Sequence, residues 1–222
     1  MTTETPTETP TETQNQDAPS GGIDLSKYDI VLAIDKSGSM RSTDMPGGKS
    51  RWDFSKEYAQ GLAHAAQKFD DDGISVVVFN DSVKVYDNVT PDVVDQVYSE
   101  QEPMGGTNTS GALKTVLDSY FERKSSGSAK PMIIQVITDG APNDQKAVAK
   151  VIVEASKKLD NEHEVGIQFL QFGKDEGATK FLEMLDDDLE GQGAKYDIVD
   201  AKPSEYVSST PVVELLKQAL TD

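Results

Sequence analysis

The stretch that decides the fold is IVLAIDKSGSM, which occupies residues 30–40. Its five consecutive apolar residues, Ile30 to Ile34, are typical of a β-strand that is buried on both faces of a sheet. The polar residues that follow at once, from Asp35 to Ser39, predict a loop at the carboxyl end of that strand. In open parallel sheets ligands bind beyond the carboxyl ends of the strands, so this loop is the first place to look for a functional site.

The same alternation of apolar strands and amphipathic helices continues along the chain. Apolar runs predict further strands over 74–79, 132–137, 165–172 and 196–199. The run 83–86 follows its predecessor after only three residues, which suits a hairpin and therefore an antiparallel strand. Apolar residues spaced three and four apart predict helices over 54–69, 92–98, 110–121, 148–159, 178–185 and 212–219.

This order of elements predicts the fold class. Strands that alternate with helices form a Rossmann-like, doubly wound α/β sheet with helices on both faces. We expect six strands, mostly parallel, with one short antiparallel strand at an edge.

The amino-terminal residues differ in composition from the rest of the chain. The sequence TETP occupies residues 3–6 and 7–10, and TETQ follows at 11–14. Thr, Glu and Pro bury too little apolar surface to offset the entropy of ordering. We therefore predict a disordered low-complexity tail over 1–22, serving as a solvated leader or, alternatively, as a tether or docking tail, and one domain over 23–222.

Charge and composition exclude several classes of function. The chain has 21 Lys plus Arg against 39 Asp plus Glu, a net charge of −18, which disfavours nucleic acid and anionic membrane surfaces as partners. It has no cysteine, which excludes disulfides, thiolate metal sites and cysteine nucleophiles. No apolar run approaches the ~20 residues that span a bilayer, and the amino terminus does not resemble a signal peptide. The expectation is a cytoplasmic protein, monomeric by default.

Oxygen-bearing side chains gather in three predicted loops. Asp35, Ser37 and Ser39 stand at alternate positions after the first strand, and a turn at Gly38 can bring them to one point. The sequence GGTNT, residues 105–109, precedes a helix, and TDG, residues 138–140, ends the strand 132–137. Oxygen donors are what hard cations such as Mg²⁺ require, although helix caps and turns use the same residues.

These three loops, in this order, resemble those of the von Willebrand factor A (vWA) family over about residues 27–220. The metal-ion-dependent adhesion site (MIDAS) of that family combines an Asp-x-Ser-x-Ser loop with a threonine and an aspartate from two further loops. The matching positions are Asp35, Ser37, Ser39, Thr107 and Asp139. The resemblance favours Thr107 over Thr109, whose hydroxyl is the alternative.

The resemblance implies that the protein is a metal-ion-dependent protein-binding module of the intracellular bacterial type and not an enzyme. The serines and the threonine would bind a divalent cation directly while the aspartates act largely through water. Neutral direct ligands leave the cation's charge incompletely neutralised, so that a Glu or Asp side chain of a partner protein can complete its coordination. Mg²⁺ is the expected cofactor, with Mn²⁺ or Ca²⁺ as alternatives.

Two other functions would use the same loop residues. A Mg²⁺-dependent phosphoryl-transfer hydrolase also places an aspartate at a strand end, but the haloacid-dehalogenase type has a second Asp where Ser37 stands. The chain has no phosphate-binding P-loop, and neither His64 nor His163 adjoins the three loops. The other alternative is a scaffold, a subunit of an ATP-driven or stress-response complex such as those of tellurite resistance, with a purely structural metal.

A segment after the first loop, Arg41–Ser50, is longer than in integrin members of the family. Its only acidic residue is Asp44. We expect Asp44 to be a solvent-exposed loop residue, and the alternative is that it reaches the rim of the site.

Overall fold

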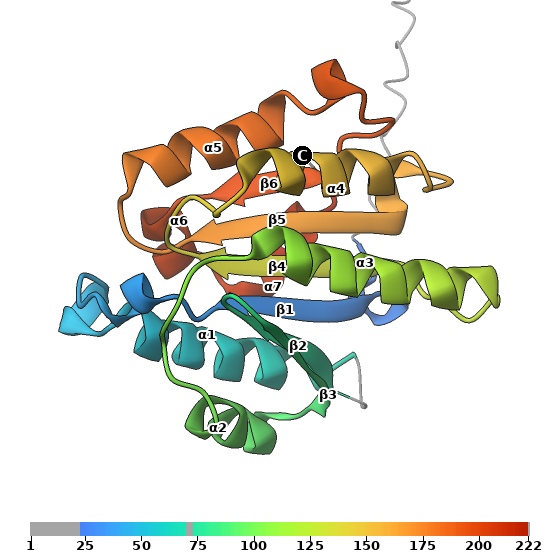
Figure 1. The fold of residues 1–222 in the computed structure, drawn as a ribbon. Coiled ribbons are helices and arrows are strands. Elements are labelled where there is room, and N and C mark those ends of the chain that lie inside the picture. The colour runs from blue at the N-terminus through green and yellow to red at the C-terminus, as the bar shows by residue number, and fades with distance from the viewer. Residues whose placement is uncertain (1–22, 70–72, 222) are drawn as a thin grey trace, which may run out of the picture.

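A six-stranded sheet forms the centre of this computed structural model, which describes residues 23–69 and 73–221 (Figure 1). The strand order is β3-β2-β1-β4-β5-β6, and only the pairing of β3 with β2 is antiparallel. The strands are β1 (Asp29–Asp35), β2 (Ile74–Phe79), β3 (Val83–Val89), β4 (Met132–Thr138), β5 (Val165–Gln171) and β6 (Val199–Lys202). The predicted sheet, with its antiparallel edge strand, is confirmed. The tail predicted over residues 1–22 lies outside the described residues.

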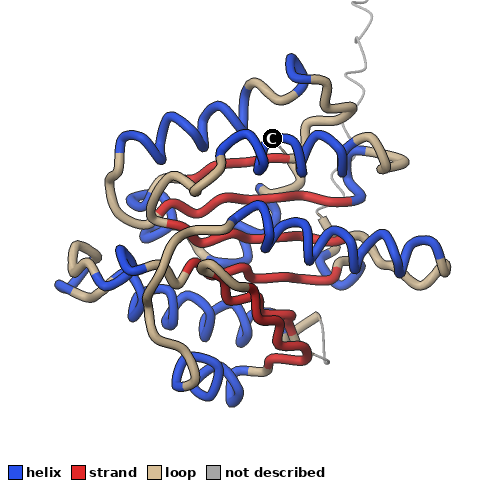
Figure 2. The backbone as a smooth tube through the Cα atoms, viewed as in Figure 1, coloured by secondary structure: helices blue, strands red, loops and turns tan. Residues whose placement is uncertain are grey.

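Helices cover both faces of the sheet, as Figure 2 shows. One face carries α1 (Arg51–Ala66), α2 (Pro91–Ser99), α6 (Ser204–Ser209) and α7 (Val212–Gln218), and the other carries α3 (Thr109–Ser125), α4 (Gln145–Ser156) and α5 (Glu176–Asp187). Alternate residues of β1 pack into the two cores: Ile30 and Leu32 face α1, while Val31 and Ala33 face α3. No helix in the described part of the chain is long and apolar enough to cross a bilayer.

The register between β1 and β4 determines where the loops lie. Ile34 is opposite Ile137, so the next residues along each strand, Asp35 and Thr138, end side by side at the carboxyl edge. Because β1 and β4 run parallel, the loops that follow both strands leave the sheet on the same side. The first and third predicted site loops are therefore neighbours.

Several element boundaries and one helix differ from the sequence prediction. Strand β3 continues to Val89, where 83–86 was predicted. The last strand begins at Val199 and continues to Lys202, where 196–199 was predicted, and α6 was not predicted. Asp200 and Lys202 interrupt the apolar pattern, although Asp200 is almost fully buried in the sheet. Tyr196 looks like a strand residue but precedes β6, and its hydroxyl donates to the carbonyl of Asp160 at 2.7 Å.

A ladder of buried polar side chains crosses the sheet beneath α1 and α7. The hydroxyl of Tyr58 donates to Gln135 Oε1 at 2.9 Å, and Gln135 Nε2 donates to Gln168 Oε1 at 2.7 Å. Gln168 Nε2 then donates to Asp200 Oδ2 at 2.7 Å and to the backbone carbonyl of Leu215, in α7, at 2.8 Å. Buried polar groups are tolerated when each has a partner, so the ladder ties α1 and α7 to the sheet in one arrangement.

We predict that Gln168→Leu destabilises the fold. The change removes the acceptor of Gln135 Nε2 and the hydrogen bonds that Gln168 donates to Asp200 Oδ2 and to the Leu215 carbonyl, and each buried hydrogen bond lost costs about 1–3 kcal/mol. Urea unfolding measures the loss, expected to be about 3 kcal/mol or more. The exposed Gln145→Leu is the matched control and should change stability by less than about 0.5 kcal/mol. Equal stabilities of the two variants would contradict a stabilising role for the ladder.

Candidate metal centre

Asp35 anchors the candidate site at the end of β1. Its side chain is completely buried. Oδ1 accepts a hydrogen bond from the backbone N–H of Ser37 at 2.7 Å, and Oδ2 accepts one from the hydroxyl of Thr138 at 3.0 Å. The first and third loops therefore hold this carboxylate from both sides.

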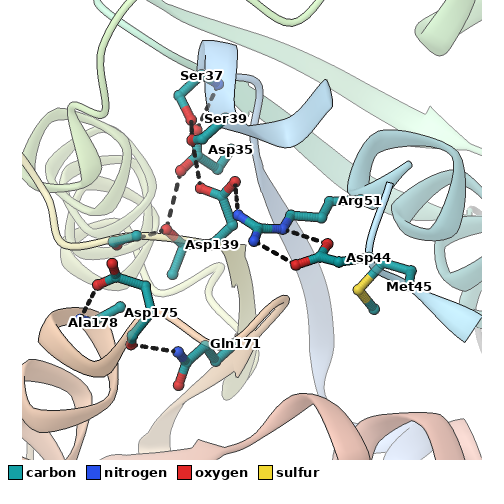
Figure 3. A network of polar contacts seen from close by, with 12 residues as sticks. Asp35, Ser37, Ser39, Asp44, Met45, Arg51, Asp139, Gln171, Asp175 and Ala178 are labelled. Atoms are coloured by element: carbon teal, nitrogen blue, oxygen red, sulfur yellow. Dashed lines mark hydrogen bonds and ion pairs between the residues drawn. The ribbon is translucent and has the colours of Figure 1, made fainter. Parts of the chain in front are cut away.

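A chain of hydroxyl contacts links the first loop to the third. Ser37 Oγ lies 3.0 Å from Ser39 Oγ, and Ser39 Oγ donates to Asp139 Oδ1 at 2.9 Å. Figure 3 shows these side chains pointing toward one another around Asp35. Four of the five predicted site residues thus meet at one place, although Ser39 and Asp139 are 100 positions apart in the sequence.

Backbone contacts hold the second loop against the other two. Gly38 N donates to the carbonyl of Gly105 at 3.3 Å, which joins the second loop to the first. Thr107 N donates to Asn143 Oδ1 at 3.2 Å, and Asn143 N donates back to the carbonyl of Thr107 at 3.0 Å, which joins the second loop to the segment after β4. A Cβ atom at Gly106 would lie 2.8 Å from side-chain atoms of Asn143 and Asp81, so any larger residue here would displace those side chains.

The two threonines of the second loop lie in different structural environments. Thr107 is a buried loop residue held through its backbone, whereas Thr109 is the first residue of α3. The helix is capped by Asn108, whose side chain accepts from Gly111 N at 3.0 Å, so neither threonine serves as the cap. The hydroxyl of Thr109 is buried without a hydrogen-bond partner among the described residues.

Asp139 lies close enough to Asp35 to affect the charge state of Asp35. Burial raises the pKa of Asp35 to about 7, and the nearby carboxylate of Asp139 adds to this rise, while hydrogen bonds from Ser37 and Thr138 oppose it. Asp139 is itself almost fully buried. A positive charge between the loops would favour the ionised form of both carboxylates.

Arg51, at the start of α1, supplies one such charge and was not predicted from the sequence. Its Nη1 donates to Asp139 Oδ2 at 2.8 Å, and its Nε and Nη2 donate to Oδ1 and Oδ2 of Asp44 at 2.9 and 2.6 Å. Asp44 was expected to be a solvent-exposed loop residue. It is exposed, but its pairing with Arg51 places it at the rim of the site, because the arginine connects it to Asp139.

A cavity of about 510 Å³ opens beside these residues. Its lining combines both charges and a hydroxyl: Ser39, Asp44, Arg51, Asp139, Gly140, Ala141, Lys174 and Asp175. A larger cavity of about 600 Å³ lies between α3 and the β2–β3 hairpin, near the start of β1 at Asp29 and Ile30, and contains none of the predicted site residues. Of these two cavities, the smaller one adjoins the candidate site.

The donor atoms fit a hard divalent cation. The predicted ligands offer carboxylate and hydroxyl oxygens, with no nitrogen or sulfur, which is the donor set of Mg²⁺, Mn²⁺ and Ca²⁺. The part of the chain that the structure describes contains no group of three or more His, Cys, Asp or Glu residues that could hold a metal. Any ion at this site therefore depends on the hydroxyls of the loops together with Asp35 and Asp139. His64 and His163 are both exposed and outside the set of predicted ligands.

Comparisons with known proteins agree with this geometry. A family model described as von Willebrand factor type A domain matches residues 30–141, about half of the chain, including the five predicted site residues. No curated protein matches the chain by sequence.

Solved structures share the fold at low sequence identity. The manganese-loaded TRAP protein of Plasmodium vivax is 15% identical, with a TM-score of 0.59 over 89% of this chain and 75% of that chain. Proximal thread matrix protein 1 from the mussel byssus, with a zinc-occupied MIDAS motif, is 19% identical, with a TM-score of 0.56 over 87% of this chain and 47% of that chain. The SpRpn10 VWA domain is 12% identical, with a TM-score of 0.56 over 86% and 94%. Two of these neighbours carry a divalent metal.

The raised pKa of Asp35 predicts a dependence of stability on pH. In chelator, the folded state keeps the proton on Asp35 up to about pH 7, whereas the unfolded chain releases it near 3.8. The contribution of Asp35 to stability is therefore complete below about pH 4 and is lost as the pH rises to 7. Urea unfolding at a series of pH values should show the parent losing stability relative to Asp35→Asn over this interval. Two curves that stay parallel from pH 4 to 8 would contradict the shift.

Proposed function

Because this chain belongs to the von Willebrand factor type A domain family, we propose that it is a metal-ion-dependent protein-binding module and not an enzyme. The observation that carries the proposal is the hydrogen bond from Ser39 Oγ to Asp139 Oδ1, beside the buried carboxylate of Asp35. It brings oxygens of the first and third loops together at the carboxyl edge of the sheet. The proposed ligands are Asp35, Ser37, Ser39, Thr107 and Asp139, with Mg²⁺ as the ion and Mn²⁺ or Ca²⁺ as alternatives.

The chain's own charges define what such a site would bind. The net charge of −18 repels an acidic partner surface over most of the molecule. A divalent cation at the site would reverse the local field and offer a coordination position to a carboxylate. Hydroxyls of Ser37, Ser39 and Thr107 contribute no charge, so they leave that field largely intact. We therefore propose a protein partner that presents a Glu or Asp side chain.

The cavity supports binding and offers little for catalysis. Ser39, at its edge, is exposed and is the proposed ligand most accessible to a partner. Neither histidine belongs to the lining, and Asp35, whose pKa is raised by burial, is completely buried. A general acid or base must be within hydrogen-bond reach of its substrate.

The first test measures two properties of the same set of variants: their affinity for the ion and their capture of partner proteins. Calorimetric titration with Mg²⁺ and Mn²⁺ should show one site in the parent chain, and at least about tenfold weaker binding in Asp35→Ala and Ser39→Ala. The exposed Ser42→Ala, three residues further along, is the matched control and should bind as the parent does. Capture of proteins from native lysate should follow the same order and disappear in chelator.

Each competing function has its own outcome in this experiment. Turnover of phosphate esters with Mg²⁺ would overturn the binding module in favour of a hydrolase. Capture that persists in Asp35→Ala, with only the melting temperature lowered, would assign the metal a structural role. A parent chain that takes up no divalent ion would overturn the proposal.

A second prediction separates the two threonines. Thr107→Val should weaken Mn²⁺ binding by about tenfold or more, because it removes a proposed ligand. Thr109→Val should leave the affinity unchanged without lowering the melting temperature, since the hydroxyl it removes is buried without a hydrogen-bond partner among the described residues. The reverse result in calorimetry would transfer the ligand role to Thr109.

A further inference from the structure

Arg51 carries a positive charge beside a proposed cation site, which is an unusual position for an arginine. It is the first residue of α1, and its side chain is only 13% exposed. Its backbone N–H donates to the carbonyl of Ser42 at 2.9 Å, and the preceding Ser50 caps the helix by accepting from Asp53 N at 3.0 Å. These backbone contacts fix the position from which the Arg51 side chain extends, independently of its charge.

The guanidinium group is also fixed by packing. A Cβ built at Gly173 would lie 2.4 to 2.7 Å from three guanidinium atoms, so the arginine rests directly against the backbone after β5. Gly173 has a φ of +81°, a conformation that other residues rarely adopt. The glycine thus leaves the space that the guanidinium group occupies.

Hydrogen bonds complete this arrangement and include a proposed ligand. Asp44 accepts both of its bonds from one edge of the guanidinium, which sets the plane of the group. The remaining nitrogen, Nη1, donates to Asp139 Oδ2, while Asp139 Oδ1 accepts from Ser39. Both oxygens of Asp139 are therefore held, one by Arg51 and one by the first loop (Figure 3).

We propose that Arg51 is a positioning residue of the ion site, holding Oδ2 of Asp139 so that Oδ1 faces Ser39, and that Asp44 acts on the site through Arg51. This inference rests on the proposed function and deepens it. It makes the segment between the first loop and α1 part of the binding site. A lysine would not serve equally, because one ammonium group cannot satisfy both carboxylates in a fixed fork geometry.

Charge alone predicts the opposite effect from positioning. A positive charge near a cation site weakens ion binding by Coulomb repulsion, so its removal should strengthen binding. Loss of a group that orients a ligand typically weakens metal affinity by about 10–100-fold. The sign of the change in Arg51→Gln therefore separates the two roles.

The test is calorimetric titration of the full chain with Mn²⁺, with the melting temperature in chelator measured in parallel. We expect Arg51→Gln to bind Mn²⁺ about tenfold more weakly than the parent, and Arg51→Lys to fall between them. Lys174→Gln is the matched control, because Lys174 lines the same cavity but its Nζ pairs with Glu205 at 2.7 Å. Its affinity should equal or slightly exceed that of the parent. Arg51→Gln binding as tightly as the parent, or more tightly, would overturn the inference.

A double-mutant cycle tests the role of Asp44. Asp44→Asn alone should weaken Mn²⁺ binding severalfold, and it should have no further effect in the Arg51→Gln background, because its contact acts through the arginine. Equal losses in both backgrounds would show direct attraction between Asp44 and the ion and would overturn the link. If Arg51→Gln does not fold, Arg51→Lys replaces it in the cycle. The Mn²⁺ affinities of Arg51→Lys, Asp44→Asn and their double variant then show in the same way whether Asp44 acts through Arg51.

The two proposals can fail separately. A parent chain that binds no Mn²⁺ overturns both the proposed function and this inference. If the Mn²⁺ affinity of the parent chain depends on Asp35 and Ser39 but not on Arg51, only the inference is overturned.

Discussion

Parallel pairing of β1 with β4 is the constraint on which the candidate site depends. Their register places Asp35 beside Thr138, and a shift by one residue would turn the side chains of either strand to the opposite core. The hydrogen bond from Thr138 to Asp35 and the one from Ser39 to Asp139 are both consequences of that register. The site is thus built on two central strands whose apolar side chains fill the two hydrophobic cores.

Burial gives this site its electrostatic character. Asp35 and Asp139 are held almost out of contact with water, and their mutual repulsion contributes to the raised pKa of Asp35. Charges in such a setting require compensation, and here it comes from hydroxyls, backbone N–H groups and the guanidinium of Arg51. In the proposed function, these loops would accommodate a cation and then an acidic group within a chain of net charge −18.

Helix α1 connects the site to the interior of the sheet. Arg51 at its first residue bonds to Asp139, and Tyr58, seven residues later, bonds to Gln135 in the strand that precedes Asp139. The ladder continues through Gln168 to the backbone of α7. The position of α1 is therefore set at both points by polar contacts with β4 and the loop that follows it, and the apolar residues between these points pack against one face of the sheet.

The sequence by itself determined the fold class, since apolar periodicity reports which face of each strand or helix is buried, and the order of strands and helices leaves few topologies. It also identified Asp35, Ser37, Ser39 and Asp139 as neighbours, because loops after parallel strands share one edge. Tertiary structure decided what periodicity does not encode. Arg51 and Asp139 are 88 positions apart, and the polar members of β6 and of the buried ladder interrupt the pattern that marks a strand. Which polar groups pair across loops depends on distances in space, and these follow only when the helices have packed onto the sheet.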